Sequence, residues 1–96
     1  MSPLKRKKLN KIRLKLDKLD NSLIKLIKQR TNLVNKVLKL KDKKKEIIDN
    51  KRIKIILKNI RKKSIANKID PKITNRIWKN MIWSYIDYEK RNFKKK

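Results

Sequence analysis

The sequence predicts an all-α fold: a three-helix subunit with a very long first helix, paired with a second copy as an intertwined antiparallel homodimer. Apolar residues recur at alternating spacings of three and four over residues 9–40, which is typical of an amphipathic helix that pairs with another. Glycine is absent, and the two prolines, Pro3 and Pro71, fall where helices can begin. With 96 residues, the chain can form one domain with a modest core.

The first helix is predicted over residues 4–41, and one position in its apolar stripe is occupied by a cation. In the heptad pattern Arg30 stands where a leucine is expected, and a buried guanidinium is costly unless an anion or hydrogen-bond partner meets it. Arg13 and Lys41 flank the same stripe near its two ends. The apolar members of the stripe are Leu9, Ile12, Leu16, Leu19, Leu23, Leu26, Leu33, Val37 and Leu40.

The length of this helix predicts the homodimer. A helix over residues 4–41 would be roughly 55 Å long, whereas a compact domain of this size has a radius of gyration of about 12 Å. Its apolar stripe therefore needs a second chain. In an antiparallel pair centred near Ile27, the partner subunit's Arg13 would meet Lys41, and both would surround one pocket with Arg30. Two-fold symmetry would repeat that pocket.

The rest of the chain predicts two shorter helices within a single domain of residues 1–96. Residues 42–46 form a polar linker, and Asp49 is a plausible N-cap for a helix over residues 49–64. Residues 64–69 are expected to form a loop. Asp70 followed by Pro71 predicts the start of a helix over residues 71–93.

The third helix places an acid among apolar side chains. At 100° per residue, Glu89 lies on the same arc as Trp78, Met81, Ile82, Tyr85 and Ile86. Two interpretations follow. Glu89 either forms a salt bridge with Arg30 or Lys41, or serves as a pocket carboxyl that burial holds protonated.

Composition excludes much chemistry. The chain has no His, Cys or Gly, which removes the usual general base, thiolate chemistry, most metal ligands and glycine-rich phosphate loops. No apolar run reaches the ~20 residues of a membrane span, so we expect a cytoplasmic protein without metal or cofactor. The net charge of +25 invites a nucleic-acid-binding interpretation. The abundance of Lys, Ile and Asn also fits a codon bias, so no specific nucleic-acid partner is expected.

Short motifs across all three helices resemble the all-helical class of chorismate mutases, in the branch that includes isochorismate pyruvate-lyase. The resemblance covers about residues 9–93. Each motif is weak alone, and their order and spacing carry the match. The motifs are Ile12-Arg13, Leu19-Asp20, Leu26-Ile27-Lys28-Gln29-Arg30, Val37-Leu38-Lys39-Leu40-Lys41, Asp49-Asn50-Lys51-Arg52 and Ile82 to Glu89.

The resemblance implies an intertwined dimer with two shared active sites and conversion of chorismate to prephenate in aromatic amino acid biosynthesis. It implies that Arg30 holds one substrate carboxylate and that the partner subunit's Arg13 holds the other. Lys41 and Glu89 would contact the ether oxygen. The substrate's hydroxyl end would lie near the start of the second helix. By the same resemblance, Asp49, Arg52 and Tyr85 join the substrate-binding residues, and Val37, Ile53, Ile56, Ile82 and Ile86 wall the pocket.

One position departs from the family pattern. Many relatives have a glutamate directly after the arginine of the second-helix motif, and here that position is Ile53. An apolar residue at this position is similar to the pattern of isochorismate pyruvate-lyase. That enzyme therefore stays open as the alternative function. A basic helical nucleic-acid-binding protein and a structural coiled coil are the alternatives outside enzymes.

Overall fold

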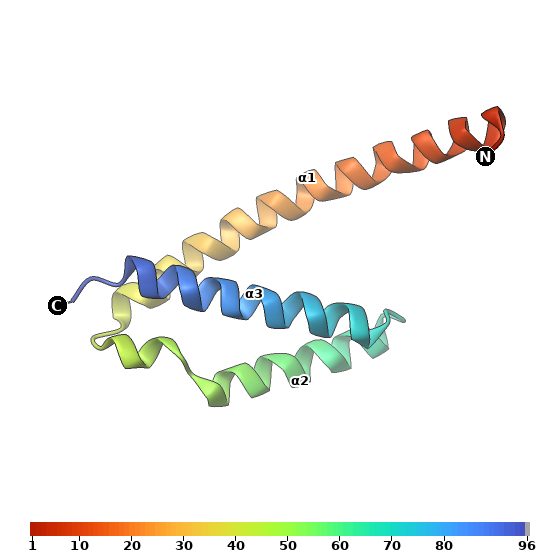
Figure 1. Cartoon of the computed structure of the whole chain (residues 1–96). Coiled ribbons are helices and arrows are strands. Elements are labelled where there is room, and N and C mark those ends of the chain that lie inside the picture. Colours follow the sequence, from red (N-terminus) through yellow and green to blue (C-terminus); the bar gives the residue numbers. More distant parts are fainter. Residues whose placement is uncertain (96) are drawn as a thin grey trace. The chain divides into compact units, whose positions relative to one another are not determined.

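The computed structural model describes residues 1–95 and consists of helices (Figure 1). No strand occurs in this part of the chain, so the predicted all-α fold with three α-helices is confirmed. The elements are α1 (Pro3–Leu40), the short 3₁₀ helix η1 (Lys44–Ile47), α2 (Asn50–Ala66) and α3 (Pro71–Asn92). None of the helices in residues 1–95 is long and apolar enough to cross a bilayer.

The chain divides into two compact units, residues 1–33 and residues 34–96. From Pro3 on, the first unit lies within α1, which has 38 residues. Ser2 caps the N-terminus of α1, because its Oγ accepts a hydrogen bond from the Lys5 N–H at 3.2 Å. The apolar stripe of this unit is exposed: Leu16, Leu19, Leu23 and Leu26 each keep more than half of their surface accessible.

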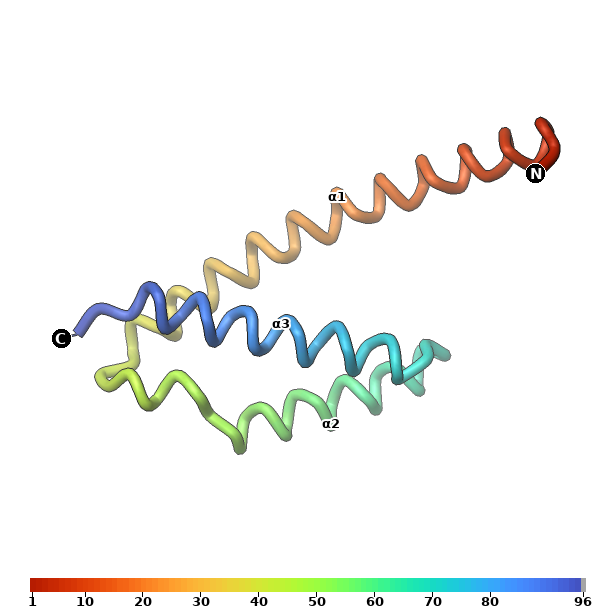
Figure 2. The backbone as a smooth tube through the Cα atoms, in the orientation of Figure 1, coloured from red at the N-terminus to blue at the C-terminus, as the bar shows by residue number. Residues whose placement is uncertain are grey.

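The second unit contains the hydrophobic core. Leu38, Ile47, Ile82 and Ile86 are buried there, and further apolar side chains from α2 and the end of α3 pack against them. Helices α2 and α3 contact each other and lie side by side (Figure 2). Their contact includes the buried Ser64, whose Oγ lies 2.7 Å from Thr74 Oγ1.

The segment before α2 is more ordered than the sequence predicts. Residues 42–46 were expected to be a polar linker, but Lys44–Ile47 form the 3₁₀ helix η1. Glu46 Oε1 accepts the Lys43 N–H at 2.9 Å, which fixes the turn locally. The turn directs Ile47 into the core, where it is only 3% exposed.

Aspartate side chains cap the N-termini of both α2 and α3. Asp49 Oδ1 accepts the Arg52 N–H at 3.0 Å, and Asp70 Oδ1 accepts the Lys72 N–H at 2.9 Å, with Pro71 at the first helical position. These side chains satisfy N–H groups that have no partner within the helix. The predicted Asp49 cap and Asp70-Pro71 start are confirmed.

The end of α2 differs from the prediction. The helix was expected to stop at residue 64, but it continues to Ala66. Lys68 then adopts a left-handed conformation with φ 57°. Its N–H donates to Ile65 O, while the Ile69 N–H donates to Ser64 O. This is a Schellman motif, in which the left-handed position is usually a glycine.

Candidate active site

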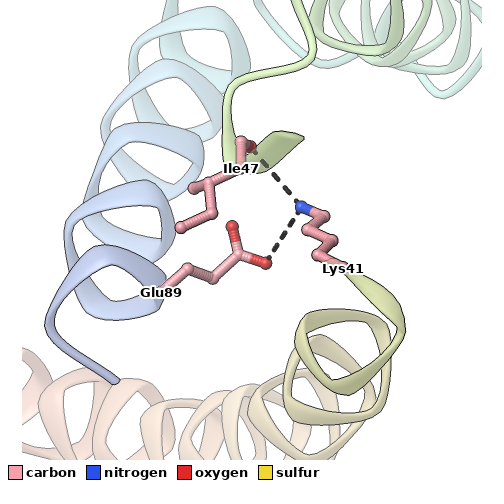
Figure 3. Close-up of polar contacts among 3 residues, drawn as sticks. All are labelled: Lys41, Ile47 and Glu89. Atoms are coloured by element: carbon pink, nitrogen blue, oxygen red, sulfur yellow. Dashed lines mark hydrogen bonds and ion pairs between the residues drawn. The ribbon is translucent and has the colours of Figure 1, made fainter. Parts of the chain in front are cut away.

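A lysine and a glutamate from distant parts of the sequence meet in residues 34–95. Lys41 directly follows α1 and Glu89 lies in the last turns of α3. Lys41 Nζ is 3.4 Å from Glu89 Oε1 and 3.5 Å from the carbonyl oxygen of Ile47 (Figure 3). The ammonium thus donates to two acceptors, which fixes its position relative to α3 and η1.

The burial of this pair is unusual for charged groups. The side chains of Lys41 and Glu89 are 17% and 8% exposed. Glu89 is buried because it continues the apolar face of α3, seven residues after Ile82 and three after Ile86. A buried carboxylate needs a charged or hydrogen-bonding partner, and Lys41 supplies one. The predicted salt bridge to Lys41 is therefore present.

Two tyrosines lie on the neighbouring part of α3. The ring of Tyr85 packs edge-on against Tyr88, with centroids 6.4 Å apart and planes at 89°. Tyr88 donates its hydroxyl hydrogen to Asn35 Oδ1 at 2.9 Å. Sequence reasoning singled out Tyr85 but missed Tyr88. The signal for Tyr88 was its position one turn after Tyr85, facing the end of α1.

The residues predicted at the start of α2 differ in exposure. Asp49 and Arg52 are exposed, and the Asp49 carboxylate caps α2. Ile53 and Ile56 are half-buried and pack against the core.

The remaining predicted wall residues fall into two groups. Ile82 and Ile86 belong to the core, whereas Val37 is 49% exposed. The structure thus brings Lys41, Glu89 and an apolar wall into one unit.

The two predicted arginine clamps belong to the other unit. Arg13 is exposed and Arg30 is half-buried, and both lie on the part of α1 within residues 1–33. The roles given to them by resemblance therefore stay predictions.

The chemistry available to the pair is hydrogen bonding and charge stabilisation. No cluster of His, Cys, Asp and Glu within residues 1–95 could hold a metal ion. Neither Lys41 nor Glu89 lines the cavities of about 400, 440 and 430 Å³ found within residues 34–95. The pair is thus a fixed donor and a buried carboxyl beside apolar side chains.

Comparison with known proteins identifies the family. The family model described as chorismate mutase type II matches residues 12–90. The chain belongs to this family, an isomerase family that converts chorismate to prephenate. The resemblance to the all-helical class of chorismate mutases is therefore confirmed, whereas the branch that includes isochorismate pyruvate-lyase stays a prediction. Searches of curated proteins and of solved structures found no match.

Proposed function

We propose that the Lys41–Glu89 pair is the catalytic centre for the rearrangement of chorismate to prephenate in this chain. The observation that carries the proposal is the half-buried ammonium of Lys41, fixed by Glu89 Oε1 and Ile47 O. An ammonium has three N–H donors. The two acceptors engage two of them, which leaves the third for a substrate oxygen.

The reaction suits such a centre. In the rearrangement one C–O bond of the substrate's ether breaks as one C–C bond forms, within a single molecule. No nucleophile, base, metal or cofactor takes part. Negative charge grows on the ether oxygen, and a donor already in place stabilises it.

The lowering of the activation free energy that catalysis requires matches what this arrangement can supply. A million-fold acceleration requires about 8 kcal/mol. One preorganised donor is typically worth about 2.7–4 kcal/mol, and holding the flexible substrate in its reactive conformation supplies a further part. Lys41, Glu89 and two carboxylate clamps would together be sufficient.

Glu89 contributes as a donor only when it is protonated. As a carboxylate it accepts from Lys41 and positions the ammonium. As a carboxylic acid it can donate to the same ether oxygen that Lys41 approaches.

The substrate's two carboxylates require cations. By resemblance, Arg30 and the partner subunit's Arg13 hold one carboxylate each, because a guanidinium can bind a carboxylate through two parallel hydrogen bonds. Asp49 and Arg52 would lie near the hydroxyl end, and Tyr85 would contact the substrate. The apolar wall would consist of Val37, Ile53, Ile56, Ile82 and Ile86.

A shared site requires the antiparallel homodimer. The exposed leucines of residues 1–33 support this part of the proposal, because a continuous apolar stripe of a helix is stable when a second helix covers it. The single domain and the cytoplasmic location also stay predictions.

The decisive experiment incubates the purified chain separately with chorismate and with isochorismate. Prephenate formed from chorismate, and lost in Arg30→Ala, supports the proposal. Salicylate formed from isochorismate without prephenate would assign the chain to the lyase instead, an outcome for which the apolar Ile53 is the specific reason. Turnover of neither substrate by folded protein would overturn both.

A further inference from the structure

A cleft between α2 and α3 lies away from the Lys41–Glu89 pair. It has a volume of about 440 Å³, which falls within the range of sites for small molecules. Both of its walls are regular helices, because its lining residues belong to 57–61 of α2 and 71–75 of α3. The two walls belong to one unit of the chain, residues 34–96.

The polar lining of the α2–α3 cleft is cationic. Lys58 and Arg61 line it from α2, and Lys72 and Asn75 line it from α3. No acid lines the cleft. Between residues 50 and 86 the only acidic residue is Asp70, and its Oδ1 accepts the Lys72 N–H as the cap of α3.

Three cations around one hollow repel one another, and an anion placed between them removes that repulsion. The ion pairs Lys41–Glu89 and Arg91–Asp87 both lie outside the cleft, so their carboxylates do not fill this role. A guanidinium, two ammonium groups and an amide are a suitable donor set for a carboxylate or a phosphate.

The remaining lining of the α2–α3 cleft is apolar, which indicates that the ligand also has an apolar part. Leu57, Ile60 and Pro71 line the same cleft, and Leu57 also packs against the hydrophobic core. A bare inorganic anion would leave this surface uncovered. A molecule with one anionic group and an apolar body would use both kinds of lining.

The other two cavities lack this combination. One cavity, of about 400 Å³, is lined by three cations, and two of them, Lys94 and Lys95, lie beyond the end of α3. The other, of about 430 Å³, includes the carboxylate of Asp42 among its lysines. Only in the α2–α3 cleft, among these three, do helix-borne cations and apolar side chains line a hollow without an acid.

We propose that the α2–α3 cleft is a second binding site, for an organic anion that carries a single carboxylate or phosphate on an apolar body. The site is separate from the proposed catalytic centre and does not depend on the mutase reaction. Its ligand is held by Lys58, Arg61, Lys72 and Asn75 at the charged end and by Leu57, Ile60 and Pro71 at the apolar end.

The test is a titration of the full ¹⁵N- and methyl-labelled chain with phenyl phosphate, benzoate and inorganic phosphate, followed by NMR. Residue-resolved shifts distinguish the cleft from Arg30 and Lys41. We expect saturable shifts centred on Ile60, Arg61 and Asn75 with at least one of the organic anions, and weaker binding of inorganic phosphate. The two organic probes distinguish a phosphate site from a carboxylate site.

Two double variants with the same net charge provide the control. Lys58→Gln/Arg61→Gln removes cations of the cleft, whereas Lys62→Gln/Lys63→Gln removes neighbouring exposed cations of α2 that do not line it. We expect the first pair to weaken binding about tenfold or more and the second by less than about twofold. If Lys58→Gln/Arg61→Gln does not fold, Lys72→Gln takes its place, because Lys72 lines the opposite wall.

Three results would overturn the proposal. One is an equal loss of affinity in both double variants, which would indicate attraction by the overall charge. Another is a set of shifts spread over lysines on all helices. The third is the absence of saturable shifts at the cleft with either organic probe.

Discussion

The ammonium of Lys41 lies 3.4 Å from Glu89 Oε1, although 48 positions separate the two residues in the sequence. The same ammonium donates to Ile47 O at 3.5 Å, so three segments of residues 34–95 meet at one charged atom. A change in any of these three segments should alter the position of the Lys41 ammonium. The catalytic proposal makes this arrangement the first one to test.

Replacing Lys41 with methionine should lower kcat by about 10²–10³-fold, because one preorganised donor to the ether oxygen is lost. The chain should also be less stable by about 1–3 kcal/mol, because Glu89 stays buried without the ammonium. Steady-state kinetics and urea unfolding measure the two effects. Lys36→Met is the control, since Lys36 is exposed in the last turns of α1, shortly before Lys41, and it should change neither quantity appreciably. Wild-type kcat in Lys41→Met would exclude the proposed centre.

Replacing Glu89 with glutamine tests whether this side chain donates to the substrate. Glu89 pairs with Lys41 as a carboxylate in this structure, and a carboxylate has no hydrogen to donate, whereas the glutamine amide can both accept from Lys41 and donate to the ether oxygen. Glu89→Gln should therefore keep or raise kcat, whereas Glu89→Ala, which can do neither, should lower it. Steady-state kinetics of the two variants measures both effects. Equal loss of kcat in Glu89→Gln and Glu89→Ala would show that only the carboxylate supports activity.

Arg30→Leu separates the enzyme from a structural coiled coil. The substitution completes the apolar stripe of α1, so the dimer should keep or increase its stability in sedimentation equilibrium. The activity should nevertheless fall by about 10²-fold or more, because one carboxylate clamp is lost. A fully active Arg30→Leu dimer would remove Arg30 from the site and favour the structural interpretation.

Local sequence signals predicted the helices well. The capping acids Asp49 and Asp70 fixed where α2 and α3 begin, since a carboxylate followed by a helical pattern needs no tertiary information to be recognised. The position of Glu89 on an apolar arc was also readable from the sequence, because a helical period assigns each residue to a face. The pairing of Glu89 with Lys41 in particular was one of two alternatives, and only tertiary structure could select it.

Two features of the structure differ from what the sequence predicted. Residues 43–46 are three lysines and a glutamate, a composition typical of a solvated linker, but residues 44–46 belong to η1, whose last residue, Ile47, is buried in the core. The burial of Ile47 depends on contacts with distant residues, which the local sequence does not show. The end of α2 was placed too early because the usual signal, a glycine after the last turn, is missing from a chain without glycine. Lys68 occupies the left-handed position instead.

Lys68→Gly should therefore stabilise the chain by about 0.5–1 kcal/mol. A left-handed conformation costs a residue with a Cβ about 1–2 kcal/mol, and glycine avoids that cost but loses more entropy on folding. Lys62→Gly, in the interior of α2, should have the opposite sign and destabilise by about 1 kcal/mol. Urea unfolding of the two variants measures both values. Destabilisation by Lys68→Gly would show that the Lys68 side chain has a stabilising role of its own.

The proposed sharing of each active site between two subunits can be tested by mixing two inactive variants. In the proposed dimer each site uses Lys41 of one subunit and the partner subunit's Arg13. Arg13→Ala and Lys41→Met homodimers should each be inactive, because both of their sites lack one residue.

A heterodimer of the two variants should contain one intact site. The intact site combines Lys41 from the Arg13→Ala chain with the unchanged Arg13 from the Lys41→Met chain, and the other site carries both substitutions. Unfolding and refolding an equal mixture gives about half heterodimers, so the activity should reach about a quarter of the wild-type value. Mixing without unfolding should give less while the chains have not exchanged. If the refolded mixture stays inactive although heterodimers form, Arg13 and Lys41 act within one chain and the antiparallel arrangement is wrong.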